Sequence, residues 1–211
     1  MKIKVCGITN QTAIIDSLGI DYIGHIFWEP SKRYISPEQI ALQSTNNKRV
    51  GVFVDESIET VIKISNRLNL KGIQLHANED AKYLQELKTE LPDTLIIKAV
   101  PIATTDDLVH LNRLDEVVDL FIFDTKGRLP GGNGTQFDWN ILSDYKASTP
   151  FLLSGGIGPG DIDALTNFKK QLNHPQFLGV DLNSKFEDSP GVKNVEKLTN
   201  FVTSLKNEAW L

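Results

Sequence analysis

The sequence predicts an α/β fold and, within that class, a closed (βα)8 TIM barrel. Eight short runs rich in β-branched and aromatic residues recur at intervals of roughly 19 to 30 residues, and segments with helical apolar spacing separate them. Several runs are almost entirely apolar, which is typical of parallel strands buried on both faces. The first run leads into Cys6-Gly7-Ile8-Thr9 rather than a G-x-G-x-x-G fingerprint. The main sequence evidence for a dinucleotide-binding sheet is therefore missing.

Each element follows from a local pattern. The apolar residues within 58–68 and within 195–205 lie close to one helical stripe. Ser36 and Pro37, followed by Glu38 and Gln39, are typical of a helix start, and a further helix is expected from Asp161 onward. Strands are expected over 3–6, 22–27, 50–54, 72–76, 95–100, 120–124, 151–154 and 178–181.

A doubly wound open sheet would use the same alternation of strands and helices. The even spacing and the missing glycine fingerprint favour the barrel. Because no linker-like stretch divides the chain, we expect one domain over residues 1–211.

Composition argues against several classes of function. The 211 residues include 22 Lys and Arg against 27 Asp and Glu, a formal net charge of −5 without a basic cluster, which disfavours nucleic-acid and membrane-surface partners. With one cysteine and four histidines at unpaired spacing, neither a disulfide nor a metal site is expected. The sequence has no signal-peptide pattern and no apolar run that would span a bilayer, so a cytoplasmic setting is expected.

Chemically capable side chains gather where the predicted strands end. The active site of a TIM barrel lies at the carboxyl ends of its strands. Those ends hold Cys6, His76, Asp124, Ser154-Gly155-Gly156 and Asp181. Each also has a structural interpretation, since a free cysteine is usually a small buried hydrophobic residue and an aspartate often caps a turn.

Three loops add to this rim. Residues 125–136 contain four glycines and exceed the usual βα connection, which predicts a lid, with a disordered surface loop as the alternative. Gly155, Gly156 and Ser184 lie in the two loops that commonly bind phosphate through backbone N–H groups. Arg33 offers a guanidinium suited to a carboxylate, with a solvated surface arginine as the alternative.

Taken together, these segments resemble the phosphoribosylanthranilate isomerase family of tryptophan biosynthesis. The matching stretches occur in the family's order over almost the whole chain. They are Lys4 to Thr9, Phe27 to Tyr34, Gly51-Val52-Phe53, Gln74-Leu75-His76, Phe123-Asp124-Thr125, Pro130 to Gly134 with Phe137-Asp138-Trp139, Ser154-Gly155-Gly156, and Gly179 to Ser184 leading to Glu187 and Ser189-Pro190-Gly191.

The resemblance implies a reaction and its two proton-transfer groups. The reaction is an Amadori rearrangement of N-(5-phosphoribosyl)anthranilate to 1-(2-carboxyphenylamino)-1-deoxyribulose 5-phosphate, with no cofactor. The family's general acid and general base correspond to Asp124 and Cys6. At their ordinary pKa values of about 3.9 and 8.5, both groups would be in the wrong protonation state at neutral pH. We expect substrate closure to desolvate Asp124, and the phosphate-binding dipoles and the developing iminium to favour a Cys6 thiolate.

The resemblance also implies the binding residues. The loop arginine that holds the anthranilate carboxylate corresponds to Arg33, and the phosphate-binding groups correspond to Gly155, Gly156 and Ser184. His76 and Asp181 are carried over as further substrate-binding residues. The partner is then a small phosphorylated molecule, and the chain is a monomer or a homodimer.

Several positions depart from the family pattern, including Ser154, Asn133 and Ala77, and two other functions stay open. Lys185 replaces a glycine beside the expected phosphate, and His25 occupies a usually apolar strand position. A different sugar-phosphate isomerase or epimerase would need neither Cys6 nor Arg33. A phosphate-binding or thiol redox-sensing protein would have a reactive Cys6 without turnover.

Overall fold

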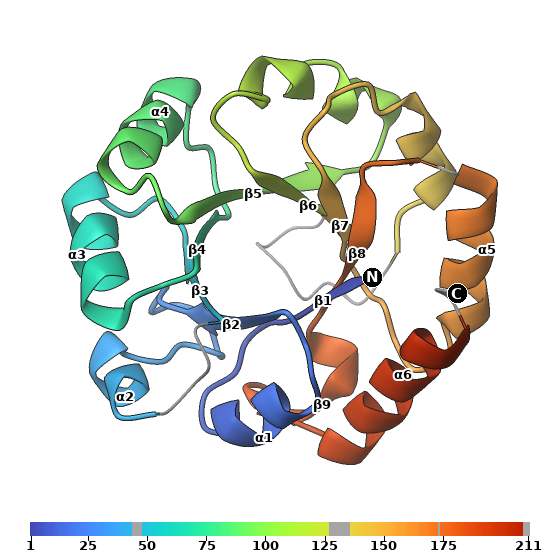
Figure 1. The fold of residues 1–211 in the computed structure, drawn as a ribbon, viewed down its shortest axis with the longest axis horizontal. Coiled ribbons are helices and arrows are strands. Elements are labelled where there is room, and N and C mark those ends of the chain that lie inside the picture. Colours follow the sequence, from blue (N-terminus) through green and yellow to red (C-terminus); the bar gives the residue numbers. More distant parts are fainter. Residues whose placement is uncertain (44–47, 127–135, 173, 209–211) are drawn as a thin grey trace.

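The structure, a computed structural model, describes residues 1–43, 48–126, 136–172 and 174–208. Its strands form one closed parallel barrel in chain order, and pairing of the first strand with the eighth closes it (Figure 1). The predicted TIM barrel is therefore confirmed. The strands are β1 (Lys2–Val5), β2 (Tyr22–Ile26), β3 (Arg49–Phe53), β4 (Gly72–Leu75), β5 (Leu95–Ile102), β6 (Leu120–Thr125), β7 (Phe151–Leu153) and β8 (Phe177–Leu182).

The α-helices lie outside the barrel wall (Figure 1). They are α1 (Thr12–Ser17), α2 (Pro37–Ala41), α3 (Ile58–Leu68), α4 (Ala81–Glu90), α5 (Ile162–Leu172) and α6 (Val195–Glu208). The predicted start at Ser36 is confirmed as a capping box, in which Ser36 and Gln39 bond to each other's backbone N–H. The helix expected from Asp161 onward is α5.

In the described parts of the connections after β5 and after β6, no α-helix is present where regular alternation predicts one. Short 3-10 helices follow β5 and β6: η1 (Thr105–Leu108), η2 (Leu111–Leu114) and η3 (Trp139–Asp144). Asp107 accepts hydrogen bonds from the N–H groups of Ala103 and Thr104, and Asp138 accepts one from Asn140. Such local hydrogen bonds to aspartate side chains compete with the backbone bonds of a continuous helix. Short 3-10 helices therefore stand at these places outside the barrel.

Alternating strand residues divide the apolar core into two layers. Phe121 and Phe123 of β6 belong to the large cluster that includes residues of the surrounding helices, whereas Leu120 and Ile122 belong to a small separate cluster. Because successive side chains of a strand point to opposite faces, the small cluster fills the barrel interior. Its apolar members are Val50, Ile97, Ala99, Leu120, Ile122 and Leu152.

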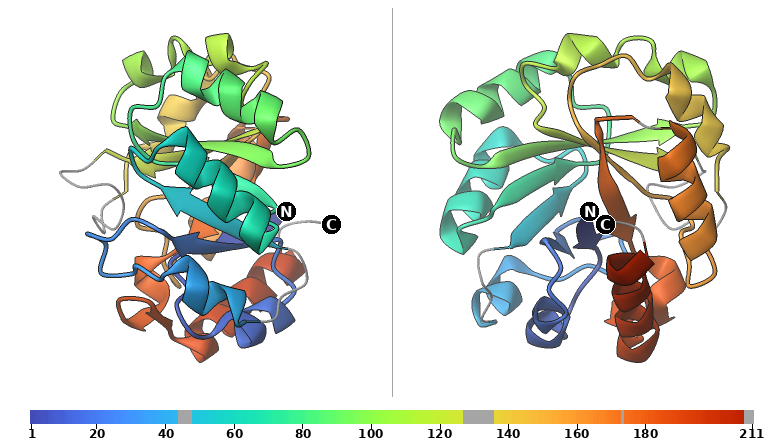
Figure 2. Two further views of the ribbon diagram at one scale, coloured as in Figure 1. Left: turned by 90° about the vertical axis from the view of Figure 1, so that its left-hand side faces the viewer. Right: turned by 45° about the vertical axis from the view of Figure 1, so that its right-hand side comes forward.

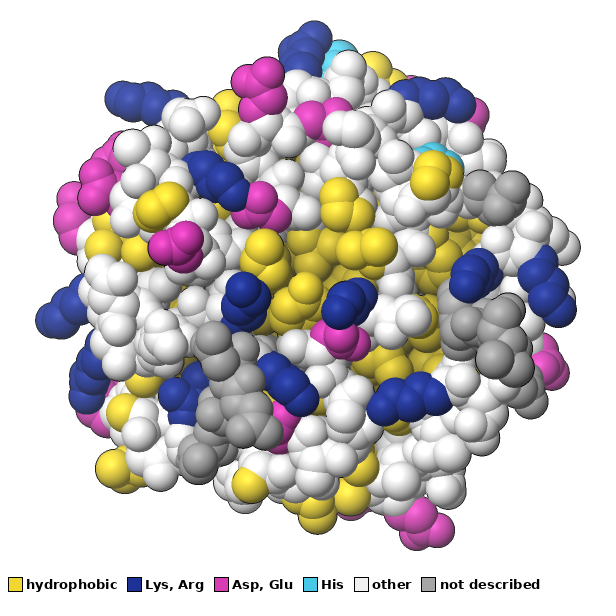
Figure 3. Space-filling model, in the orientation of Figure 1, with side chains coloured by type: hydrophobic (Ala, Val, Ile, Leu, Met, Phe, Trp, Pro, Cys, Tyr) yellow, Lys and Arg dark blue, Asp and Glu magenta, His cyan; other side chains and the backbone are white. Residues whose placement is uncertain are grey.

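After β8 the chain forms η4 (Ser184–Phe186) and a hairpin of β9 (Glu187–Ser189) and β10 (Val192–Lys193). The N-terminus lies on the face where the strands begin (Figure 2). On that face, basic and acidic side chains alternate around a more apolar middle (Figure 3). No helix within the described part of the chain is long and apolar enough to cross a membrane.

Candidate active site

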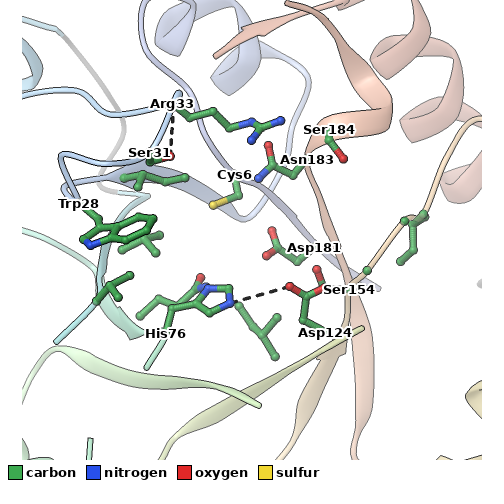
Figure 4. Close-up of a pocket in the computed structure, with 18 residues that line it drawn as sticks. Cys6, Trp28, Ser31, Arg33, His76, Asp124, Ser154, Asp181, Asn183 and Ser184 are labelled. Atoms are coloured by element: carbon green, nitrogen blue, oxygen red, sulfur yellow. Dashed lines mark hydrogen bonds and ion pairs between the residues drawn. The ribbon is translucent and has the colours of Figure 1, made fainter. Parts of the chain in front are cut away.

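One pocket at the carboxyl ends of the strands brings together all eight residues singled out in the sequence. Its volume is about 770 Å³ including the open mouth. Side chains from several strands and loops point into it (Figure 4). The lining residues are Cys6, Ile26, Trp28, Ser31, Arg33, Val52, Val54, Gln74, His76, Ile122, Asp124, Ser154, Gly155, Gly156, Ile157, Asp181, Asn183 and Ser184.

Cys6 directly follows β1 and is held tightly in place. Its N–H donates to the carbonyl of Leu182, which continues the β1–β8 ladder, and the residue is buried. Gly7 has φ +74°, and a Cβ there would lie 2.7 Å from Arg33 Cδ. A Cβ on Gly24 of β2 would lie 2.7 Å from the Cys6 Sγ, so that glycine leaves room for the thiol. Burial raises the pKa of Cys6 despite the opposing charge of Lys4.

Asp124, near the end of β6, is buried and faces His76 across the pocket (Figure 4). Its Oδ1 accepts a hydrogen bond from the N–H of Thr125 at 2.9 Å, and its Oδ2 lies 3.8 Å from the His76 Nε2. Burial raises the pKa of Asp124 to about 6, against the effect of the Thr125 N–H and with the Asp181 charge adding to the rise. Burial lowers the pKa of His76 to about 4, so the imidazole is neutral at neutral pH.

Gln74 of β4 contacts His76, which directly follows that strand. Its Nε2 lies 3.3 Å from the His76 Nδ1, while its own Oε1 is buried without a hydrogen-bond partner among the described residues. When the Gln74 amide donates to the His76 Nδ1, the proton of the neutral imidazole lies on Nε2, which faces Asp124. Sequence reasoning used Gln74 only as part of a motif.

Asp181 of β8 forms an ion pair in the barrel interior. The Lys4 Nζ lies 3.0 Å from both carboxylate oxygens, and Lys4 is fully buried. Lys4 was not predicted as a site residue, because an isolated lysine in a short strand gives no indication that its partner lies across the barrel seam.

Arg33 is paired within the chain rather than solvated. Its Nε and Nη2 donate to the carboxylate of Glu187 in β9, at 2.7 to 3.0 Å. The buried Lys193 Nζ donates to the same carboxylate at 2.7 Å. Burial opposes ionisation of Glu187, but the two cations outweigh it and hold its pKa below the ordinary value. Arg33 also lines the pocket, and its Nη1 has no hydrogen-bond partner among the described residues.

The loops after β7 and β8 present free backbone donors. Among the described residues, no acceptor bonds the N–H groups of Gly155, Gly156 or Ser184. Such unpaired donors at loop turns and helix starts favour an anion. Gly155, at φ +86°, is required for another reason too: a Cβ there would lie 2.2 Å from the Thr125 Oγ1. Lys185 is exposed and packs beside Gly158, just outside the pocket.

Most of the predicted lid, residues 127–135, lies outside the described residues. No cluster of His, Cys, Asp and Glu in the described part of the chain could hold a metal ion.

Comparison with known proteins identifies the family. The family model described as N-(5'phosphoribosyl)anthranilate (PRA) isomerase matches residues 3–204. The chain belongs to the phosphoribosylanthranilate isomerase family. The N-(5'-phosphoribosyl)anthranilate isomerase of Parabacteroides distasonis is 41% identical over 216 residues, which cover 99% of this chain and 95% of that protein.

Solved structures of phosphoribosylanthranilate isomerases share the barrel. One, in complex with reduced 1-(o-carboxyphenylamino)-1-deoxyribulose 5-phosphate, has a TM-score of 0.79 and 27% identity over 98% of both chains. Another, of monomers generated from the dimeric isomerase of Thermotoga maritima, has a TM-score of 0.79 and 28% identity over 98% of both chains.

Proposed function

We propose that this chain catalyses the Amadori rearrangement of N-(5-phosphoribosyl)anthranilate in tryptophan biosynthesis, with Asp124 as general acid and Cys6 as general base. The observation that carries these roles is the convergence of both groups on one pocket that also contains a guanidinium and unpaired backbone donors. We further propose that the chain acts as one catalytic domain in the cytoplasm, as a monomer or homodimer. A small phosphorylated molecule is its substrate.

Asp124 and Cys6 carry the two proton transfers that lead to the enol. The Asp124 carboxyl donates a proton to the furanose ring oxygen, the C1′–O bond breaks, and the anthranilate nitrogen supplies the electrons that form a Schiff-base cation. The Cys6 thiolate then removes the proton from C2′; that electron pair forms the C1′–C2′ double bond, and the iminium electrons return to nitrogen. The resulting enolamine becomes the ketone by taking up a proton at C1′ and releasing the proton of its 2′-hydroxyl, so both residues regain their starting protonation. Each well-placed acid or base contributes about 10²–10⁴ in rate.

The protonation states need not both be dominant. With a pKa of about 6, about a tenth of Asp124 is protonated at neutral pH. The raised pKa of Cys6 makes the thiolate a minority form as well. Between the two pKa values, each rise in pH lowers the fraction of protonated Asp124 and raises the fraction of thiolate by the same factor. The population of the reactive pair is therefore constant over that range.

The remaining lining residues define the orientation of the substrate. Trp28 with Ile26, Val52 and Val54 forms an apolar wall beside Arg33, which suits an aromatic ring that carries a carboxylate. The donors of Gly155, Gly156 and Ser184 suit the phosphate. His76 and Asp181 lie between these two ends, facing the ribose.

The test is turnover of the labile substrate made in place from anthranilate and phosphoribosyl pyrophosphate by a separate transferase. We expect the wild type to remove the substrate's fluorescence, and Cys6→Ala and Asp124→Asn to lose about 10²-fold or more in rate. Asp144→Asn, which changes an exposed aspartate in the same way, should match the wild type. Unchanged rates in both site variants would overturn the acid and base roles, and no turnover by folded wild type would overturn the function.

A further inference from the structure

The proposed acid and base steps leave one buried charge pair without a task. Lys4 is fully buried, and Asp181, which lines the pocket, is 6% exposed. Removing two charges from water is costly, and well-packed apolar residues often stabilise a fold as well as a buried ion pair does. The barrel alone therefore gives no reason for a charged pair at this place.

The pair lies against the Cys6 thiol. Lys4 and Cys6 are two residues apart along β1, so their side chains leave the backbone on the same side. That side is the barrel interior, where Lys4 pairs in register with Asp181 of β8. The Lys4 ammonium favours a Cys6 thiolate by charge attraction, whereas the Asp181 carboxylate disfavours it by repulsion.

We propose that Lys4 is a positioning residue for the reaction: its ammonium, held in place by Asp181, is the counter-charge that sets how readily Cys6 becomes a thiolate. The use of that thiolate in turnover rests on the proposed function. The ionisation of the thiol itself does not, so the two ideas can fail separately.

Among the charged groups around Cys6, Lys4 has the largest effect in favour of the thiolate. Burial favours the neutral thiol and so raises the pKa of Cys6, and the Lys4 charge is the strongest effect in the opposite direction. The Asp181 charge also favours the neutral thiol, while Lys193 of β10 favours the thiolate more weakly than Lys4 does. The nearby imidazoles of His25 and His76 are neutral, since burial lowers the pKa of each to about 4. Asp124 also senses the Lys4 charge, which opposes the rise in its pKa.

The first experiment is the pH dependence of Cys6 alkylation by iodoacetamide. Cys6 is the single cysteine, so the reaction reports on this thiol alone. We expect Lys4→Met to move the midpoint upward by about one pH unit or more, as loss of an adjacent cation does. Asp181→Asn keeps the cation and removes the anion, so its midpoint should stay unchanged or move downward.

A double variant separates this role from a purely structural one. Lys4→Met leaves the Asp181 carboxylate buried without a counter-charge, whereas Lys4→Met/Asp181→Asn removes both charges and should still show an upward shift. The proposal is overturned if either lysine variant leaves the midpoint in place. It is equally overturned if Asp181→Asn shifts the midpoint upward as far as Lys4→Met does.

Turnover provides an independent readout. In Lys4→Met, kcat/KM should fall about tenfold for each unit by which the thiol midpoint rises beyond the rise in the Asp124 pKa that loss of the same charge causes. The alkaline limb should move to higher pH. The deficit should therefore shrink at alkaline pH. A defect of folding or packing would instead lower kcat/KM by the same factor at every pH, and that result would contradict the proposal.

Discussion

At the scale of the residue, the site depends on what burial does to two titratable groups. Burial raises the pKa of Asp124 and also that of Cys6. Burial alone already raises the pKa of Asp124 in the direction expected of substrate closure. Without substrate, burial outweighs the cations near Cys6 and the thiol is favoured, so the stabilisation of a thiolate by bound substrate stays a prediction.

This arrangement predicts the pH profile of the free enzyme. We expect kcat/KM to fall below pH about 6, where Asp124 is already protonated and further acid only removes thiolate. It should be flat above that pH and fall again once Cys6 is mostly ionised, because only protonated Asp124 is then being lost. Steady-state kinetics over this range measure both limbs. If a variant shifts the pKa of Asp124 and the acid limb of kcat/KM stays at the same pH, the assignment of that limb to Asp124 is contradicted.

At the scale of the element, the end of β6 and the loop after β7 are fitted together. A Cβ on Gly155 would lie 2.2 Å from Thr125 Oγ1, 2.6 Å from Thr125 N and 2.9 Å from Asp124 Oδ1. The φ of +86° at Gly155 is unfavourable for any other residue. The same glycine therefore shapes the expected phosphate loop and limits the room around Asp124, the proposed general acid.

Gly155→Ala should affect both stability and activity. We expect a loss of about 2 to 4 kcal/mol in the free energy of unfolding, from backbone strain and overpacking together. A drop in kcat should accompany it because the Asp124 carboxylate is displaced. Chemical denaturation and turnover measure the two effects. Gly160→Ala is the matched control, since its Cβ would meet nothing within 4 Å; equal effects of the two variants would refute this account.

The elements were predictable because their patterns are local. All eight strands lie within about two residues of the runs that predicted them, and Ser36 marks a helix start in both sequence and structure. The 3-10 helices after β5 and β6 were not predicted, because competition by aspartate side chains depends on geometry that apolar spacing does not reveal. Among the residues that line the pocket, Cys6, His76, Asp124, Ser154-Gly155-Gly156 and Asp181 were singled out because they lie at strand ends.

The partners of those residues were not predictable in the same way. Lys4 and Asp181 are 177 positions apart and meet only because β1 pairs with β8. Arg33 meets Glu187 only because the β9–β10 hairpin returns to the pocket. Long-range register creates these contacts, so a single sequence gives the residue types but not their pairing.

At the scale of the whole molecule, the site is maintained at a cost in stability. Unfolded aspartate loses its proton near its ordinary pKa of 3.8, whereas Asp124 in the folded chain keeps its proton up to about pH 6. Over that interval the folded state binds more protons than the unfolded state, so stability falls as pH rises. Above pH 6 the full cost of the buried carboxylate is present, at most about 3 kcal/mol for a shift of about two units.

Asp124→Asn should therefore stabilise the protein while it removes the proton donor. The asparagine Oδ1 can still accept the Thr125 N–H bond, and the amide carries no charge to desolvate. We expect the free energy of unfolding to rise by about 1 to 3 kcal/mol at pH 7, and the gain to shrink toward zero as pH falls below 3.8. Urea denaturation of both proteins across this range measures the difference, with Asp144→Asn as the exposed control. A gain in the free energy of unfolding that does not depend on pH would show that the burial of charge is not its source. A loss of stability would show that the Asp124 carboxylate stabilises the fold.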